Sequence, residues 1–338
     1  MSVDLDTLVR ELNARYTDPT RNRIVGETAA PRPRFELYHF HLSLCSYKLR
    51  TVLDEKQAPY ISHDIDIFPP DIQNYYPEYV RLRLKGGEEL QNGTFVSGYT
   101  GRSSTESEGF DPCVVPTLVD HEAGRVLVNS KRMCLHLDSA VPTGTELVPA
   151  DIEDAVIEQM DIVDRTPHVA VLYGAHPGHD PRPAFVRRDM PGVHDMKIGK
   201  VRDNMALVPK EPALVRAYEA KIAKESAAKQ FVRTEPDMRG AIEEFRQIVA
   251  RLDRDLAATS KTWFFGDRFT MADVFWAVSL FRMRWLGLGY LFMPGGPESR
   301  PRIAAYSQAL LARPSFRRAV IFWPNHPPSE HLPEFYQH

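Results

Sequence analysis

The chain has 338 residues, of which 43% are hydrophobic and 26% are charged. This balance is typical of a globular protein with enough apolar side chains for two domains, and it excludes a largely disordered chain. The formal net charge of −3 excludes a global positive field that would attract nucleic acid or an anionic membrane. We therefore expect neither nucleic acid nor membrane as a partner.

Cysteine usage and the apolar stretches of the chain indicate its compartment. The three cysteines are Cys45, Cys113 and Cys134. An odd, sparse set argues against a disulfide framework and favours a reducing cytoplasm. The first residues lack the apolar core of a signal peptide. The most apolar stretch, residues 275–292, contains Arg282 and Arg284, so we expect a core helix there rather than a membrane span.

In the first half of the chain, strand patterns alternate with helical ones. Alternating apolar residues, many aromatic or β-branched, predict strands at 35–40, 60–67, 114–119 and 125–128. Helical periodicity predicts helices at 47–56 and at 130–140, the second beginning at Ser130. The expected order is β-α-β, then a long excursion, then β-β-α.

The second half of the chain changes character near residue 150. Strand patterns fade there, and helical periodicity occurs at 151–165, 213–231, 237–258, 270–286 and 301–312. The segment 141–151 between the halves contains Pro, Gly and Thr, which suits a domain boundary. We expect two long loops, at 86–112 and 174–193, which form functional lids or poorly ordered surface.

One of the three cysteines, Cys45, lies at a predicted strand-to-helix junction. Cys45 follows the strand pattern and precedes a basic helical segment that contains Lys48 and Arg50. Unsatisfied amides and the helix dipole stabilise a thiolate at such a junction. A buried, inert cysteine is an equally good interpretation from location alone. The flanking Ser43 and Ser46 cap the helix or donate a hydrogen bond to a bound thiolate.

Two further motifs favour a small-ligand site. Pro116, after Val115 in a strand-like run, is either an ordinary edge-strand proline or part of a cis peptide that exposes backbone groups to a ligand. Asn129 and Ser130 stand at the start of the next helix. A serine hydroxyl with free amides makes a carboxylate site there, although a plain N-cap is the better interpretation of this motif alone.

Taken in order, these motifs resemble the glutathione transferase superfamily. The resemblance rests on SLCSYKLR at 43–50, VPTL at 115–118 and the serine-led helix, and it covers residues 34–325. It implies an N-terminal extension at 1–33, a thioredoxin-like α/β domain at 34–141 with a long insertion at 86–112, and an all-helical substrate-binding domain at 150–325. The FTMAD segment at 269–273 is similar to a buried capping box of the superfamily, which is structural.

The resemblance also implies roles for individual residues. Within the superfamily, SLCSYKLR looks most like the cysteine-bearing reductive dehalogenases of chlorinated hydroquinones. Cys45 is then the redox nucleophile, and Ser43 holds or activates the glutathione thiolate, with Ser46 beside it. The remaining glutathione-binding residues implied are Val115, Pro116, Asn129 and Ser130. The superfamily usually has an acidic residue where this chain has Asn129, which accepts a hydrogen bond from the γ-glutamyl ammonium but supplies no charge.

The implied function is glutathione-dependent reductive dechlorination of a chlorinated hydroquinone, with glutathione as co-substrate and no metal. His39-x-His41 and His176-x-x-His179 have spacings that occasionally bind metal, but they lack a companion set of ligands. Two alternatives stay open. One is glutathione-dependent cleavage of β-aryl ethers of lignin-derived phenols, and the other is a non-enzymatic subunit of a catalytic partner. The superfamily implies a dimer, either homodimer or heterodimer.

Overall fold

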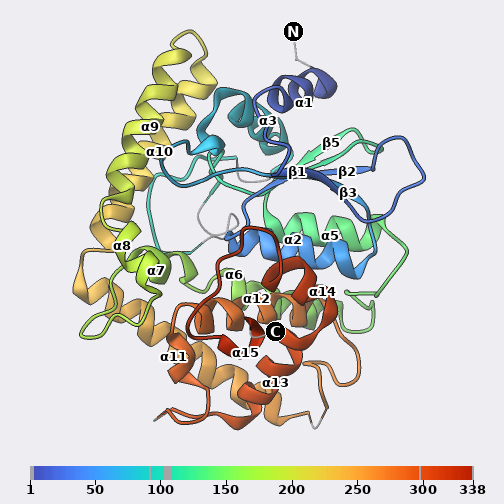
Figure 1. The fold of residues 1–338 in the computed structure, drawn as a ribbon, viewed down its shortest axis with the longest axis vertical. Helices are drawn as coiled ribbons and strands as arrows, with labels where there is room; N and C mark the ends of the chain where they lie inside the picture. Colours follow the sequence, from blue (N-terminus) through green and yellow to red (C-terminus); the bar gives the residue numbers. More distant parts are fainter. Residues whose placement is uncertain (1–3, 91–92, 103–108, 260, 297, 337–338) are drawn as a thin grey trace.

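A mixed sheet forms the centre of the N-terminal half. The structure is a computed structural model, and it describes residues 4–90, 93–102, 109–259, 261–296 and 298–336. The 5-stranded sheet has the order β1-β3-β2-β4-β5 (Figure 1). In chain order, its strands are Asn22–Val25, Phe35–His39, Tyr60–Asp64, Thr117–Asp120 and Arg125–Leu127. β2 and β3 are parallel and the other neighbouring pairs are antiparallel.

Helices cover both faces of this sheet, so its central strands are buried. On one face lie α2 (Leu44–Glu55) and α5 (Ser130–Ala140), which pack against each other between the sheet and the helical half (Figure 1). On the other face lie α1 (Leu5–Asn13) and α3 (Pro77–Gly87). Along β2, Leu37 joins the first core and Tyr38 the second, as the alternation of side chains in a strand requires.

Residues 4–33 contribute more to the sheet than the sequence patterns indicated. Periodicity predicted no element there, yet the structure has α1 and β1. β1 pairs with β3, and the Asn13 side chain donates a hydrogen bond to the buried Glu36 at 2.7 Å. These elements escape prediction because β1 is only four residues long and partly exposed, with Ile24 55% exposed.

Among its described residues, the second half contains many helices and no strand beyond two isolated β-bridges at 263–268. The predicted helices are present as α6 (Glu153–Asp164), α10 (Pro212–Phe231), α11 (Glu235–Ala257), α12 (Met271–Trp285) and α13 (Pro301–Ala312). The shorter helices are α7 (His168–Tyr173), α8 (Ala184–Asp189), α14 (Pro314–Phe316) and α15 (Pro333–Tyr336). The expectation of a loop throughout 174–193 is wrong, because α8 lies within it. The predicted fold class, a thioredoxin-like domain followed by an all-helical domain, is confirmed.

A helix that periodicity did not predict, α9 (Val193–Leu207), forms a long hairpin with α10. Figure 1 shows this hairpin standing beside the N-terminal half, and α10 contacts α3. The buried side of α9 carries His194, Lys197 and Asn204 alongside valines and an isoleucine. Polar residues on the buried side conceal the apolar stripe on which a helix prediction depends.

The two halves are joined by packing of α2 against α12 and by polar contacts. α12 is buried along its whole length, and its FTMAD start forms the predicted capping box. The Thr270 amide donates to Asp273 at 2.8 Å, and the Tyr306 hydroxyl donates to the same carboxylate at 2.7 Å. Within the described part of the chain, no helix is both long enough and apolar enough to cross a bilayer.

Candidate active site

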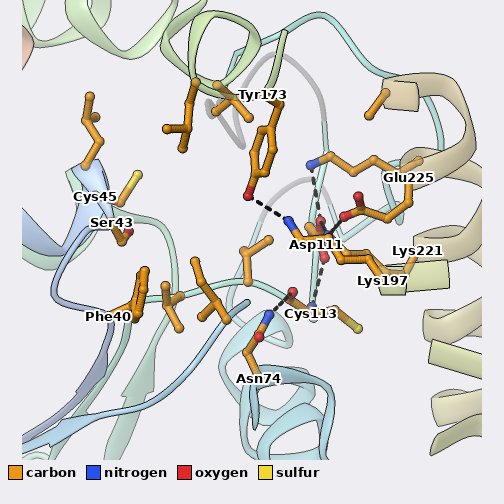
Figure 2. Close-up of a pocket in the computed structure, with 18 of the residues that line it drawn as sticks. Phe40, Ser43, Cys45, Asn74, Asp111, Cys113, Tyr173, Lys197, Lys221 and Glu225 are labelled. Atoms are coloured by element: carbon orange, nitrogen blue, oxygen red, sulfur yellow. Dashed lines mark hydrogen bonds and ion pairs between the residues drawn. The ribbon is translucent and has the colours of Figure 1, made fainter. Parts of the chain in front are cut away.

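A cleft between the two halves brings most of the predicted site residues together. One side, here called the α2 wall, comprises the loop before α2, its first turn, the Val115–Pro116 bond and the start of α5. The opposite side, the α9/α10 wall, carries side chains of α9 and α10, with α7 beside them. Figure 2 shows Cys45 on one side of the cleft and Lys197 on the other. All the predicted site residues except Ser46 line the cleft.

On the α2 wall, Ser43 and Cys45 occupy the start of α2. Ser43 is the N-cap, and its Oγ accepts a hydrogen bond from the Ser46 amide at 3.3 Å. Cys45, in the first turn, is half-buried and in no disulfide. Amides of this turn lack intrahelical acceptors and form the positive end of the helix dipole, an environment that attracts anionic groups. Cys45 lines the cleft, as the reactive interpretation requires.

Ser46 lies behind this surface. Its side chain is 0% exposed, and its Oγ accepts a hydrogen bond from the Phe40 amide at 3.3 Å. Ser46 therefore fixes the loop between β2 and α2, and its hydroxyl does not line the cleft as the family resemblance implied.

Two buried cations support the same loop and helix. Lys48 is 0% exposed and forms an ion pair with Asp164 of α6. Burial alone lowers the pKa of Lys48, but the charges of Asp164 and Cys45 outweigh it and raise the pKa above its usual value. Lys48 therefore stays a cation one helical turn from Cys45. Arg282 of α12 donates to the Leu42 carbonyl and so holds the loop before α2.

The Val115–Pro116 peptide bond is cis, as one of the two interpretations of this motif requires. Both residues line the cleft. Side chains of α3 hold this segment in place. The Tyr79 hydroxyl donates to the Val114 carbonyl at 2.9 Å, and Arg83 donates to the Pro116 carbonyl.

The start of α5 differs from the sequence expectation in one respect. Asn129, not Ser130, is the N-cap, and its Oδ1 accepts from the amides of Lys131 at 2.9 Å and Arg132 at 3.4 Å. The plain N-cap interpretation of Ser130 is therefore wrong, and the Ser130 side chain lines the cleft. Because the helix engages the Asn129 oxygen, that oxygen is not placed to accept a hydrogen bond from a γ-glutamyl ammonium as expected.

The other two cysteines are buried more deeply than Cys45. Cys113 lines the cleft but is 0% exposed, and its burial, together with the Asp111 carboxylate, raises the pKa of its thiol well above the usual value. Cys134 in α5 is also 0% exposed, and burial raises its pKa in the same way. Cys45 is therefore the cysteine best placed for thiolate chemistry.

The α9/α10 wall carries a charged network that sequence patterns did not reveal. Lys221 and Lys224 each lie 3.1 Å from Asp111, and Lys221 also lies 2.8 Å from Glu225. Burial raises the pKa of both carboxyl groups, but nearby lysines outweigh it and leave the pKa of Asp111 and of Glu225 well below the usual range. The network is therefore made of full charges facing the cleft.

His194, Lys197 and Tyr173 extend this network. His194 Nδ1 lies 2.7 Å from Glu225, and Lys197 donates to the Tyr173 hydroxyl at 2.6 Å (Figure 2). Sequence reasoning missed His194 and Lys197 because it recognised no helix over α9. The available signal was spacing: His194, Lys197 and Val201 recur every three or four residues, and thus share one face of α9.

Two further histidines singled out by the sequence, His39 and His168, have protein partners. His39 contacts Ser62 at 2.8 Å and Arg50 at 3.0 Å, so it does not pair with His41 around an ion. His168 lines the cleft, is 3% exposed, and contacts Ser279 at 2.9 Å. Among the described residues, no group of three or more His, Cys, Asp or Glu side chains is arranged to hold a metal ion.

Comparison with known proteins identifies the family. The 2,5-dichlorohydroquinone reductive dechlorinase of Sphingobium indicum is 48% identical to this chain, and the alignment covers 98% of each chain. The family model for the glutathione S-transferase C-terminal domain matches residues 217–309. The chain belongs to the glutathione transferase family. The family resemblance of the sequence motifs is thereby confirmed.

Two further proteins are similar to this glutathione transferase, one in sequence and one in structure. Tetrachloro-p-hydroquinone reductive dehalogenase of Sphingobium chlorophenolicum is 26% identical, with 86% of this chain and 96% of its own aligned. Among solved structures, the beta-etherase LigF from Sphingobium sp. strain SYK-6 superposes with a TM-score of 0.52 at 16% identity, covering 85% of this chain and 98% of its own. At that identity, the second similarity shows the shared fold.

Proposed function

We propose that this glutathione transferase removes chlorine reductively from a chlorinated hydroquinone, using two molecules of glutathione for each chloride released. The observation that carries the proposal is the position of Cys45, partly exposed on the first turn of α2 beside Ser43 and within the cleft. The relative that is 48% identical is named for such a reaction. Glutathione transfer alone needs no second thiol, whereas reduction does, and Cys45 supplies it.

The α2 wall suits the binding of glutathione. The Ser130 hydroxyl, at the positive end of the α5 dipole, binds the carboxylate of the γ-glutamyl group. The backbone of Val115, next to the cis Pro116, pairs with the cysteinyl part, and the Ser43 hydroxyl donates a hydrogen bond to the thiolate. Asn129 takes part as the cap that holds α5 and Ser130 in place.

The proposed reaction begins with the keto tautomer of the hydroquinone, in which the chlorine-bearing carbon also carries a hydrogen. Glutathione thiolate forms a carbon–sulfur bond at this carbon, and chloride leaves with the electron pair of the broken carbon–chlorine bond. The Cys45 thiolate then attacks the glutathione sulfur. A disulfide forms, the carbon–sulfur pair returns to the ring, and the aromatic phenolate departs without its chlorine.

A second glutathione completes the cycle. Its thiolate attacks the mixed disulfide at the glutathione sulfur, so oxidised glutathione leaves and the Cys45 thiolate is restored. The ring carbon gains two electrons, and the two glutathione sulfurs each lose one. Chloride and oxidised glutathione are therefore released in equal amounts.

The direct test measures both products. The purified enzyme is incubated with glutathione and a chlorinated hydroquinone, and chloride and oxidised glutathione are quantified over time. We expect a ratio of one to one, and we expect Cys134→Ala, which changes a buried cysteine outside the cleft, to retain it. Absence of chloride release would contradict the proposal. Phenol release from an aryl ether would then support ether cleavage, and no turnover of either substrate would support the non-enzymatic subunit.

The dimer and the cytoplasmic location remain predictions from the sequence. Mass measured by light scattering on the isolated chain separates a homodimer from a monomer that requires a different partner subunit. We propose the homodimer or heterodimer as alternatives that this measurement decides.

A further inference from the structure

A histidine on the α9/α10 wall has one ring nitrogen without a partner. His194 lines the cleft and is 6% exposed. Its Nδ1 lies 2.7 Å from a Glu225 carboxylate oxygen, but its Nε2 is buried and makes no hydrogen bond to any described residue. Buried polar atoms in proteins almost always have partners. An unpartnered nitrogen on the wall of a cleft therefore points to a ligand group as its partner.

Glu225 determines which nitrogen of His194 carries the proton. Lys221 holds the other carboxylate oxygen at 2.8 Å. Burial opposes the charged form of Glu225, but Lys221 and Lys197 outweigh it and keep the pKa of Glu225 well below the usual range. A carboxylate accepts a hydrogen bond from Nδ1–H, so Nε2 carries the lone pair in the neutral form of the imidazole and is the nitrogen without a described partner.

A hydrogen-bond donor stands beside this base. The ring centres of Tyr173 and His194 are 5.1 Å apart, and Lys197 donates to the Tyr173 hydroxyl at 2.6 Å. Because an ammonium group only donates, the Tyr173 oxygen accepts from it and keeps its own proton for another acceptor. A hydroxyl that accepts from a cation is also the stronger donor. Figure 2 shows the Tyr173 ring directed into the cleft, with Cys45 on the other side.

We propose that His194 is the catalytic base and acid that converts the bound hydroquinone into its keto tautomer. Tyr173 donates a hydrogen bond to the oxygen that becomes the carbonyl, and Glu225 is the positioning residue that acts through His194. This inference rests on the proposed function and names the proton-transfer site that its first step requires. The groups that face His194 are Glu225 and Lys221 of α10, Lys197 of its own helix, and Tyr173 of α7.

The proton transfer balances without an external reagent. The phenolic O–H bond breaks, its proton moves to His194 Nε2, and the oxygen electron pair forms the C=O bond. The displaced ring electron pair then takes a proton from the imidazolium at the chlorine-bearing carbon. The ring is isomerised, nothing is oxidised or reduced, and His194 returns to its neutral form.

Exchange of ring hydrogens with solvent tests this step separately from dechlorination. The probe is chlorohydroquinone, the dechlorinated product of 2,5-dichlorohydroquinone, because its reacting ring carbon carries hydrogen in place of chlorine. Tautomerisation at this carbon replaces that hydrogen by deuterium when the enzyme and chlorohydroquinone are incubated in heavy water. We expect wild type and Cys134→Ala, each with glutathione, to catalyse exchange above the uncatalysed background, measured by proton NMR. His194→Gln is expected to reduce the exchange rate at least ~100-fold, the usual contribution of a general acid–base group.

Further variants separate proton transfer from folding. Tyr173→Phe removes only a hydroxyl and is expected to slow exchange. Glu225→Gln is expected to lower the exchange rate at saturating hydroquinone at least ~10-fold while the half-saturation concentration stays unchanged, a split that a merely structural role would not produce. His176→Gln is the control, because His176 is 6% exposed and contacts the Val171 carbonyl but does not line the cleft. We expect it to keep the wild-type exchange rate.

The outcomes distinguish this inference from the proposed function. Unchanged exchange in both His194→Gln and Tyr173→Phe overturns the inference, and so does wild-type enzyme that shows no exchange above background. Exchange that depends on His194, together with no chloride release, supports the proton-transfer site and contradicts dechlorination. Chloride release, together with exchange that His194→Gln does not change, supports dechlorination and contradicts the proton-transfer site.

Discussion

At the start of α5, two adjacent residues have different tasks that sequence patterns could not separate. Asn129 has a φ of 75°, a left-handed conformation that asparagine tolerates better than most residues, and its side chain caps the helix. Ser130 therefore does not cap the helix, and it lines the cleft. The absence of an acidic residue at position 129 is compatible with this arrangement, because the amide oxygen satisfies the same helix amides.

Because Asn129 caps the helix and Ser130 lines the cleft, their alanine variants are expected to change different quantities. Ser130→Ala is expected to raise the KM for glutathione about tenfold, the effect of losing one hydrogen bond to a charged group, with little change in melting temperature. Asn129→Ala is expected to lower the free energy of unfolding by about 1 kcal/mol because the cap is lost. Steady-state kinetics and urea unfolding of both variants check the prediction. A melting temperature that falls in Ser130→Ala but not in Asn129→Ala would contradict it.

At the residue scale, residues of the α2 wall could be predicted because each stands at one end of a strand or where a helix begins. Cys45, Pro116 and Ser130 each stand at a strand end or helix start that local patterns identify. The α9/α10 wall was not predictable, because the pairing of His194 with Glu225 depends on how two helices pack against each other. Ser46 shows a further limit: sequence does not tell which of two neighbouring serines faces a cleft and which faces the core.

At the scale of elements, α2 and α6 are joined by a buried ion pair. Lys48 is 0% exposed and Asp164 is 7% exposed, so each charge depends on the other for compensation. The ammonium group also lies 4.3 Å from the centre of the Phe275 ring in α12. Through Lys48, the helix that carries Cys45 is anchored to the helical half.

We expect Lys48→Met to lower the free energy of unfolding by about 3 kcal/mol, because it leaves Asp164 buried without a counter-charge. The double variant Lys48→Met with Asp164→Leu is expected to be more stable than Lys48→Met alone. An exposed pair gives the control: Arg239→Met, next to Glu235 with both side chains 63% exposed, should change stability by less than about 0.5 kcal/mol. Urea unfolding of the four proteins measures these differences, and a double variant no more stable than Lys48→Met would contradict the coupling.

The same scale explains which elements sequence patterns identify. α2, α5, α11 and α12 have apolar stripes or long apolar runs, and each was predicted within a few residues of its ends. β1 was missed because short edge strands carry little pattern, and α9 was missed because its buried side is partly polar. Two of the polar residues that obscured α9, His194 and Lys197, line the cleft.

At the scale of the whole molecule, buried neutral histidines set a limit on stability in acid. Burial lowers the pKa of several imidazoles below their usual value, and these residues are His39, His168, His176 and His326. For His176, burial lowers the pKa from 6.5 to about 4. Between these two values, the unfolded chain binds a proton that the folded protein does not. Stability is therefore complete above pH 6.5 and falls as the pH drops toward 4.

From this we predict that the protein loses stability in mild acid. His176 alone contributes a loss of about 2 kcal/mol between pH 7 and pH 5, since one pKa unit corresponds to 1.36 kcal/mol. His176→Gln should reduce the dependence of the unfolding free energy on pH in this interval by that amount. Urea unfolding at both pH values measures it. An equal pH dependence in wild type and variant would show that His176 does not titrate on unfolding.

The overall arrangement places different side chains on the two walls of one cleft. The α2 wall presents Cys45, and the α9/α10 wall presents Lys197 (Figure 2). The two-domain architecture followed from sequence periodicity and motifs. The pairing of these walls did not, because it depends on how the hairpin packs against the N-terminal half.

The central claim, that Cys45 is the redox thiol, is tested most directly by the products of Cys45→Ser. Wild type and variant are incubated with glutathione and 2,5-dichlorohydroquinone, and the aromatic products are identified by mass spectrometry. We predict that wild type yields the dechlorinated aromatic with oxidised glutathione, whereas Cys45→Ser releases chloride but accumulates the glutathionyl-aromatic thioether. Formation of the dechlorinated aromatic by Cys45→Ser at the wild-type rate would contradict the account.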